Sequence, residues 1–265
     1  MRILFFGDIV GEVGRKAVLN NISKLITKYQ IDFVIANGEN ATHGKGLIER
    51  HYLELIDGGV DCLTLGNHYL SKNQILDYID DATNLVRPIN LSKRIGGEGS
   101  LLFTLRGVKI RVTNVLGEAF MNETVTSPYY TFKNLLDSLY DEDSIHIVDF
   151  HGEATSEKIA FAYAFDGSVS AIVGTHTHVQ TNDARILDNG TGFISDAGMC
   201  GDANGILGFE KNSVMNKTLF GNKSTFEIDV NGQQMVNAVV IDIDEYSKKC
   251  RDIFPIRVLG ERKHV

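Results

Sequence analysis

The sequence predicts an α/β fold built on a parallel β-sheet. Over the first eighty residues, short apolar runs alternate with segments of helical periodicity, which is the pattern of strand and helix units. The expected strands end in polar residues, and open α/β sheets bind ligands at that edge. With 265 residues, 43% hydrophobic and 23% charged, the chain is long enough to bury a sizeable core. No repeat or linker divides it, so one domain over residues 1–265 is expected.

In the first half of the chain, short apolar runs predict strands, and apolar positions three or four residues apart predict helices. The helix expected over 47–56 is closed by Gly58-Gly59. Ser71, with Gln74 three residues later, resembles a capping box and predicts a helix that continues through Ile79. In order, the expected elements are strand 3–6, helix 15–29, strand 33–36, helix 47–56, strand 62–65 and the helix that ends at 79.

The second half of the chain has a different organisation. Within residues 96–117, two strands separated by Arg106-Gly107 are typical of an antiparallel hairpin. The Gly- and Asn-rich stretch over 196–222 predicts long surface loops. The remaining expected elements are helix 129–140, strand 145–150, helix 153–165, strand 169–173 and two late strands, 235–243 and 253–258.

Charge and cysteine content narrow the class of protein. The net charge of -8 argues against a general nucleic-acid coat or a membrane-surface protein, because both need basic patches. The three cysteines are odd in number and far apart, which indicates a reducing, intracellular compartment. The first residues lack the long apolar core of a signal peptide, and no apolar run is long enough to span a bilayer. A cytoplasmic protein is therefore expected.

The stretch from Gly174 to His178 contains two histidines separated by one residue. The apolar run 169–173 leads into it and predicts a buried strand. In an extended segment, side chains two residues apart point the same way, and their α-carbons lie roughly 6.5 Å apart. His176 and His178 are therefore expected to reach into one space, and imidazole is the commonest protein ligand of transition metals. On these residues alone, two solvated loop histidines remain an alternative.

Potential metal ligands recur where the expected strands stop. Each has a structural alternative: Asp8 could cap a helix or a turn, Asn40 and Asn67 could occupy left-handed turns, and a lone histidine could lie at the mouth of a cleft. The joint pattern favours a metal site, because carboxylates, amides and imidazoles are all suitable ligands. The residues are Asp8, Glu39, Asn40, Asn67, His68, His151, His176 and His178.

The number of candidate ligands predicts two ions. Without His68, the seven remaining candidates exceed the four ligands of a structural zinc site, and they suit a pair of ions about 3.5–4 Å apart, bridged by a carboxylate and a hydroxide. Such a pair generates hydroxide near neutral pH and neutralises charge on the oxygens of a phosphate ester. An imidazole that is not a ligand can then protonate the leaving oxygen. His68 suits this role, because its neighbour Asn67 would point to the metal.

The same residues lie in motifs that resemble those of the calcineurin-like metallophosphoesterases: Gly7-Asp8, Asn37 to Asn40, Gly66 to His68, Phe150-His151 and Gly174 to His178. Four longer sequence segments resemble those of one branch, the bacterial YmdB-type phosphodiesterases: NGENATHGKG (37–46), NLVRPIN (84–90), HGEATSEK (151–158) and GTHTHVQT (174–181). The similarity covers residues 1 to about 243, nearly the whole chain, and its motifs are highly specific.

The resemblance implies a metallophosphoesterase fold, with a two-sheet β-sandwich flanked by α-helices. It implies two divalent or mixed-valence transition-metal ions, iron or manganese, with zinc or magnesium as alternatives. The implied reaction opens 2′,3′-cyclic nucleotides to 3′-nucleotides, with His68 as general acid. If the family's ligand roles are assigned to the matching positions, Asp8, Asn40 and His178 would hold one ion. Asn67, His151 and His176 would hold the other, and Glu39 would bridge the two.

The chain departs from the broad superfamily at two positions. Val10 occupies a position where a histidine is expected, and Glu39 replaces the usual bridging aspartate. Both departures are characteristic of the YmdB-type branch, in which Asn40 compensates. Members of the branch self-associate, so the resemblance also implies a homo-oligomer.

Three basic residues are candidates for contact with a substrate phosphate. They are Lys45, Arg87 and Arg94, and solvated surface charge is the alternative for each. Arg87 is the first to test, because Pro88 stiffens its loop and the segment matches the branch.

Two rival functions remain open at the level of sequence. The first is the same two-ion chemistry on another ester, in a dimetal phosphatase or an RNA-end phosphoesterase, although the acidic chain disfavours long nucleic acid. The second is a regulatory protein that senses metal or nucleotide and hydrolyses it only incidentally. The leading expectation is a phosphodiesterase with a small cyclic-nucleotide substrate and no membrane partner.

Overall fold

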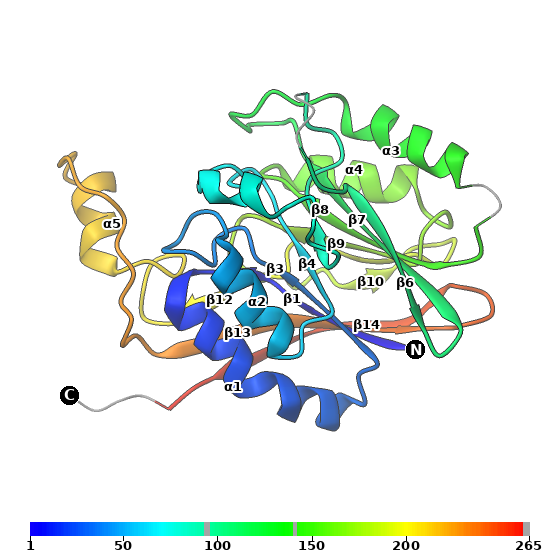
Figure 1. The fold of residues 1–265 in the computed structure, drawn as a ribbon, viewed down its shortest axis with the longest axis horizontal. Helices are drawn as coiled ribbons and strands as arrows, with labels where there is room; N and C mark the ends of the chain where they lie inside the picture. The colour runs from blue at the N-terminus through cyan, green and yellow to red at the C-terminus, as the bar shows by residue number, and fades with distance from the viewer. Residues whose placement is uncertain (93–95, 140–141, 262–265) are drawn as a thin grey trace.

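The computed structural model describes residues 1–92, 96–139 and 142–261, which form two β-sheets packed face to face (Figure 1). Helices α1 (Gly11–Tyr29) and α2 (Glu49–Asp57) cover the outer face of the first sheet. Helices α3 (Pro128–Ser138) and α4 (Thr155–Ala164) cover the outer face of the second. The expected β-sandwich flanked by helices is therefore confirmed.

The first sheet is mixed. Strands β1, β3, β4 and β5 run parallel, whereas β13 pairs antiparallel with β1 on one side and with β14 on the other. The parallel sheet expected from the first eighty residues is thus confirmed, and the end of the chain extends it in the opposite direction. The strand order is β2 (Asp8–Ile9), β12 (Met199–Asp202), β13 (Gln234–Ile243), β1 (Arg2–Phe6), β3 (Phe33–Asn37), β4 (Cys62–Thr64) and β5 (Leu85–Val86), with β14 (Cys250–Leu259) on β13.

The second sheet has a parallel centre and antiparallel edges. Strands β7, β8, β9 and β11 run parallel, while β6 and β10 pair antiparallel at the two edges. The strand order is β10 (Arg185–Ile186), β11 (Gly192–Ile194), β9 (Ala171–Thr175), β8 (Ile145–His151), β7 (Val108–Leu116) and β6 (Ser100–Leu105).

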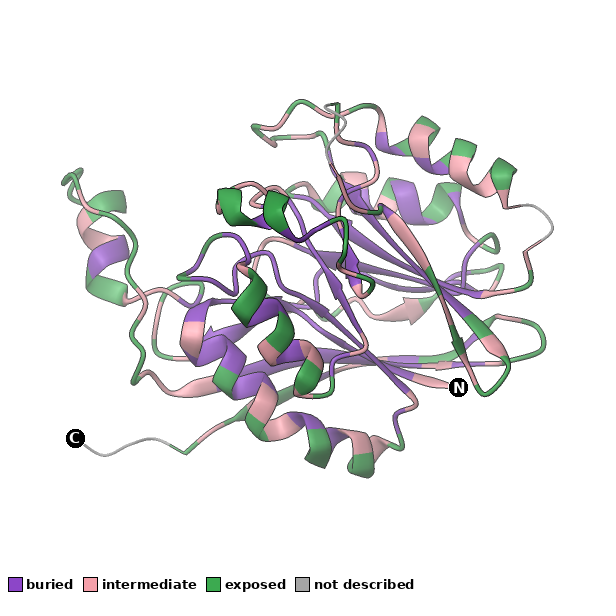
Figure 2. Ribbon diagram, in the orientation of Figure 1, coloured by how far each residue is buried: buried purple, intermediate pink, exposed green. Residues whose placement is uncertain are grey.

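Strand β1 shows why the central strands are apolar without interruption. Alternate side chains of a strand point to opposite faces. Ile3 and Phe5 pack between the two sheets, whereas Leu4 and Phe6 pack against the helices of the outer layer. A strand buried on both faces therefore needs a continuous apolar run, and the central strands are buried throughout in Figure 2.

The hairpin expected around Arg106-Gly107 is confirmed. β6 and β7 pair antiparallel from Ser100 with Thr113 to Leu105 with Val108. Both turn residues have positive φ, 49° at Arg106 and 83° at Gly107. A two-residue turn with positive φ at both positions matches the twist of the paired strands.

The capping box expected at Ser71 is wrong. The chain instead forms a short 3-10 helix, η1 (Asn73–Asp77), whose N-cap is Lys72 and has no side-chain capping bond. The helix expected over 129–140 is α3, which ends at Ser138, and Tyr140 lies outside the described residues.

The strand expected over 169–173 lies two residues later, as β9. Gly174 and Thr175 pair with Phe150 and His151 of β8, so the ladder continues past the apolar run. The surface loops expected over 196–222 are wrong in part, because this stretch contains β12, buried at all four residues, and α5 (Lys211–Thr218). β12 is buried because it pairs with both β13 and β2.

Candidate metal centre

The eight polar residues predicted at strand ends come together where the carboxyl ends of the parallel strands meet. Asp8 lies in β2, directly after β1, and His151 is the last residue of β8. The others occupy the turns that follow β3, β4 and β9: Glu39 and Asn40, Asn67 and His68, and His176 and His178. Gly66 permits this close packing, because a Cβ there would lie 2.4 Å from both Glu39 Oε2 and His151 Nε2.

Glu39 lies at the centre of the group and is fully buried. Its Oε1 is 3.1 Å from His151 Nε2 and accepts a hydrogen bond from Asn40 Nδ2 at 3.0 Å. Its Oε2 accepts from the backbone N–H of His68 at 2.9 Å. Burial alone would raise the pKa of Glu39, but the charge of His151 and hydrogen bonds with His151 and His68 hold that pKa well below its usual range. Glu39 is therefore an ionised carboxylate, available as a ligand.

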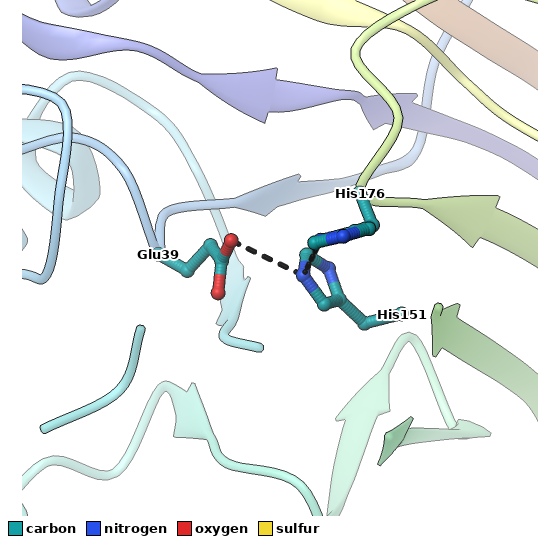
Figure 3. Close-up of side chains that lie close together, drawn as sticks. All are labelled: Glu39, His151 and His176. Atoms are coloured by element: carbon teal, nitrogen blue, oxygen red, sulfur yellow. Dashed lines mark hydrogen bonds and ion pairs between the residues drawn. The ribbon is translucent and has the colours of Figure 1, made fainter. Parts of the chain in front are cut away.

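His151 Nε2 faces three electron-rich atoms at once. They are Glu39 Oε1 at 3.1 Å, Asn67 Oδ1 at 3.0 Å and His176 Nδ1 at 3.0 Å. Burial lowers the pKa of His151, but Glu39 and Asp8 together raise it to about 9. Among the described residues, Glu39, His151 and His176 offer ligand atoms within 4.8 Å of one another (Figure 3). A single N–H proton cannot serve three acceptors, whereas a cation can.

His176 is held with one nitrogen free to bind a cation. Its Nε2 lies 3.2 Å from Glu153 Oε2, and donation to that carboxylate leaves the Nδ1 lone pair directed at His151. Burial, and then the charge of His151, lower the pKa of His176 to about 3, so the ring is neutral. Glu153 was not singled out from the sequence, although it lies in the word HGEATSEK.

His178 and Asp8 form a second group of donors beside Glu39. His178 Nδ1 donates to the Leu207 carbonyl at 2.9 Å, which leaves Nε2 facing Asp8 Oδ1 at 3.9 Å. Asp8 is fully buried, and its Oδ1 has no hydrogen-bond partner within the described chain. Burial raises the pKa of Asp8, while His178 and His151 oppose that shift. A buried carboxylate oxygen without a donor, next to two imidazoles, fits a bound cation.

The amide nitrogen of Asn40 contacts both Glu39 and His178. Nδ2 donates to Glu39 Oε1 and lies 3.2 Å from His178 Nε2, so the NH₂ group stands where a cation would face these acceptors. The oxygen, Oδ1, accepts from His68 Nδ1 at 2.7 Å. Asn40 can bind an ion only through Oδ1, which faces His68 here. If the amide is rotated so that its oxygen and nitrogen exchange places, Oδ1 faces the other donors and Nδ2 donates to His68 Nδ1.

The extended geometry expected for His176 and His178 is wrong. Both residues have positive φ, 100° and 65°, and lie beyond the end of β9. Lys158 fixes the start of this turn, because its buried Nζ donates to the Thr175 carbonyl at 2.7 Å and to Asp196 Oδ2 at 2.9 Å. Asp196 Oδ2 also accepts from the backbone N–H and the hydroxyl of Thr177 at 3.0 and 2.8 Å.

Two structural alternatives for these residues are excluded. The N-cap of α1 is Val10, so Asp8 does not cap that helix. Neither Asn40 nor Asn67 has positive φ, so neither occupies a left-handed turn.

Asp149 supports His151 from behind and was missed in the sequence. Its buried carboxylate accepts from Thr175 Oγ1 at 2.6 Å and from Asn37 Nδ2 at 3.0 Å. Since the Thr175 proton points to Asp149, the Thr175 oxygen accepts from His151 Nδ1 at 2.9 Å. When a cation replaces the Nε2 proton of His151, this chain of bonds keeps the remaining proton on Nδ1 and leaves Nε2 for a ligand role.

The site opens into a cleft of about 800 Å³. Lys45 lines the cleft, as the phosphate-contact hypothesis requires. Arg87 does not line it: the Arg87 guanidinium donates to the carbonyls of Gly96 and Pro88, so that candidate is wrong. Arg94 lies outside the described residues. No helix in the described part of the chain is long and apolar enough to cross a bilayer.

The chain is similar to known proteins over nearly its whole length. A family model described as YmdB-like protein matches residues 4–256. The 2′,3′-cyclic-nucleotide 2′-phosphodiesterase of Bacillus subtilis (strain 168) is 43% identical over 249 residues, covering 94% of each chain. A solved structure of a novel phosphatase from Mycoplasma pneumoniae superposes with a TM-score of 0.91 at 39% identity, covering 99% of this chain and 95% of that one. A hypothetical protein from Thermus thermophilus gives 0.90 at 34% identity, with 98% and 100% covered.

Proposed function

Because the chain belongs to the YmdB-like family and is a hydrolytic phosphoesterase, we propose that it opens 2′,3′-cyclic nucleotides to 3′-nucleotides. The observation that carries the proposal is the cluster around Glu39, in which carboxylate, amide and imidazole donors from both sheets meet at the floor of a cleft. The Bacillus subtilis relative, named for this reaction, supports the choice of substrate.

We assign the donors to two divalent ions, iron or manganese, with zinc or magnesium as alternatives. When bound, the ions lower the pKa of water toward neutrality and neutralise charge on the phosphoryl group. Two observations support a cation at each of two positions. Asp8 Oδ1, beside His178, has no hydrogen-bond partner in the described chain, and His151 Nε2 faces three acceptor atoms at once. Asp8, Asn40 and His178 would hold one ion, Asn67, His151 and His176 would hold the other, and the Glu39 carboxylate would be shared by both.

His68 acts as the general acid. Its Nδ1 lies 2.7 Å from the Asn40 amide, and its side chain, 24% exposed, lines the cleft. With the Asn40 amide rotated so that Oδ1 can bind an ion, Nδ2 donates to His68 Nδ1 and the proton of His68 lies on Nε2. Nε2 makes no hydrogen bond to any described residue, so it is the nitrogen that meets the substrate. In the reaction one water is consumed: it loses a proton to solvent as its oxygen bonds to phosphorus, the P–O2′ bond breaks, and His68 gives a proton to the departing 2′-oxygen and regains one from solvent. The product is a 3′-phosphomonoester.

Replacement of His68 tests this function. His68→Ala should keep the metal content of the wild type, yet lower kcat on 2′,3′-cyclic AMP by about 10²–10⁴-fold, the usual contribution of a general acid. Product analysis should show 3′-AMP rather than adenosine and free phosphate. His43 is the matched control, because it lines the same cleft and contacts His51, outside the metal cluster. If His68→Ala hydrolyses the substrate at the wild-type rate, the general-acid assignment is wrong.

A further inference from the structure

The cleft extends well beyond the residues that surround Glu39. Its volume of about 800 Å³ lies toward the upper end of the roughly 300–1,000 Å³ found for small-molecule sites. One wall comes from the segment that contains α5, and the His178–Leu207 hydrogen bond joins that segment to the metal cluster. Such a volume leaves room beside a mononucleotide for a second base.

The wall from the α5 segment carries an aromatic pair, of which Phe226 is exposed and Phe209 half-buried. The rings of Phe209 and Phe226 lie 5.4 Å apart at 50°, and both line the cleft. Phe226 is 39% exposed, and Lys217 Nζ lies 4.8 Å from the centre of its ring. An exposed aromatic ring next to a cation is the arrangement on which single-stranded nucleic acids stack their bases.

Three lysines line the same cleft, and no described residue forms an ion pair with any of them. They are Lys45, Lys72 and Lys217. The chain next to Lys45 packs against Lys72, because a Cβ on Gly46 would lie 2.8 Å from Lys72 Cγ. The two carboxylates that line the cleft, Glu39 and Glu153, belong to the donors around His151 and His176, so the three lysines add positive charge to the cleft of a chain whose net charge is -8. It complements a second phosphate, in addition to the one at the metal cluster.

We propose that the cleft contains a second nucleotide subsite, and that short oligoribonucleotides ending in a 2′,3′-cyclic phosphate are preferred substrates. The inference rests on the proposed function, since the terminal cyclic phosphate occupies the metal cluster. The preceding base stacks on Phe226, and the phosphodiester that joins the two nucleotides meets the three lysines. The bond that breaks is the same P–O2′ bond as in the mononucleotide.

A comparison of two substrates tests the subsite. We expect kcat/KM for the adenosine dinucleotide with a 2′,3′-cyclic phosphate end to exceed that for 2′,3′-cyclic AMP by about 10- to 100-fold, the size of one base–aromatic stacking contact. Phe226→Ala should lower this ratio by about 10-fold or more, because it removes the stacking contact and leaves only the lysines. Phe220→Ala is the matched control, because Phe220 is an exposed aromatic of the same segment that does not line the cleft. The control should keep the wild-type ratio.

Binding of the product gives a readout without turnover. By calorimetry, the dinucleotide 3′-phosphate should bind more tightly than 3′-AMP to the wild type and to Phe220→Ala, and this preference should be smaller by about 10-fold or more in Phe226→Ala. If the wild type hydrolyses 2′,3′-cyclic AMP but prefers neither the dinucleotide substrate nor its product, the subsite is disproved and the proposed function stands. If neither substrate is hydrolysed, the proposed function itself fails. An equal loss of preference in both Phe variants would remove Phe226 from the subsite.

Discussion

Asp149 and Thr175 hold the imidazole of His151 from the side that faces away from the cluster. Asp149 offers only acceptors to three donors, so the Thr175 hydroxyl proton is committed to it. The Thr175 oxygen is then an acceptor for His151 Nδ1–H. Partners of this kind orient a ligand histidine, and their loss typically costs 10–100-fold in metal affinity.

Removal of the Thr175 hydroxyl tests that role. Thr175→Val keeps the shape of the side chain but cannot accept from His151, so metal affinity should fall by about 10–100-fold. Thr175→Ser restores the hydroxyl and should bind metal nearly as the wild type does. Isothermal titration of the metal-free protein with Mn²⁺ measures both. Equal affinity of the valine and serine variants would show that the hydroxyl does not position His151.

His146 makes the stability of the fold depend on pH. Burial, and then the charge of Arg111, lower the pKa of His146 to about 3, against an ordinary value of 6.5. Between these pH values the unfolded chain binds a proton that the folded chain does not. The contribution is therefore fully present above pH 6.5 and is lost as the pH falls toward 3, by up to roughly 1.4 kcal/mol per pH unit.

The measurement is urea unfolding of the wild type and His146→Gln at several pH values from 7.5 to 4. Other buried histidines titrate in the same range, so the difference between the two proteins is the informative quantity. The wild type should lose stability more steeply with acidification. Parallel curves for the two proteins would contradict the assignment to His146.

At the residue scale, the positions of the cluster could be predicted from the sequence, but their orientation could not. Asp8, Glu39 and His151 stand out because polar residues follow apolar runs. Asp149 did not, because it lies inside such a run and its partners come from other strands. The direction of the Asn40 amide depends on contacts with Glu39, His68 and His178, which no local pattern encodes.

At the scale of secondary-structure elements, the buried ion pair between Lys158 and Asp196 ties α4 to the turns after β9 and β11. Both side chains are almost fully buried, at 1% and 2% exposure, and both bond to the segment that carries His176. Lys158 lies on the buried face of α4 with Phe161 and Ala162. A lysine on an otherwise apolar face is the signal that could have identified it from the sequence.

Lys158→Met should destabilise the fold strongly, because it leaves Asp196 as an unpaired buried charge. Breaking a buried pair in this way typically costs about 3–5 kcal/mol. Lys133→Met is the control, since its pair with Asp137 is exposed and should contribute little. Chemical unfolding of the three proteins measures the effect. Similar losses for the two variants would mean that the Lys158 pair does not secure α4.

The elements that could be predicted are those with a local signal. β1, β3 and α1 have apolar periodicity, and the turn of the β6–β7 hairpin contains Arg106-Gly107. β2 and β5 contain two residues each, too few for any periodicity. β12 is a strand only because distant segments pair with it on both sides, and such pairing has no local signature.

At the scale of the whole molecule, the cluster of polar residues around Glu39 joins the two sheets. Asp8 and Glu39 come from the first sheet, whereas His151 and His176 come from the second. The Glu39–His151 contact, drawn in Figure 3, crosses between the two sheets. The two-sheet sandwich could be expected from the resemblance to a family but not from the periodicity of the sequence. Apolar runs mark the strands, but they do not show how the strands divide between two sheets or that the sheets pack face to face. The strand ends did indicate that one edge would hold the ligands.

Metal content of the purified protein is the most direct test of the claim that Glu39 lies between two cations. After reconstitution with Mn²⁺ and removal of free metal, the wild type should retain two ions per chain by plasma mass spectrometry. Glu39→Gln should retain fewer than one, because both groups lose the shared carboxylate. Glu153→Gln, which changes a partly exposed partner of His176, should retain most of the metal. Wild-type metal content in Glu39→Gln would contradict the account.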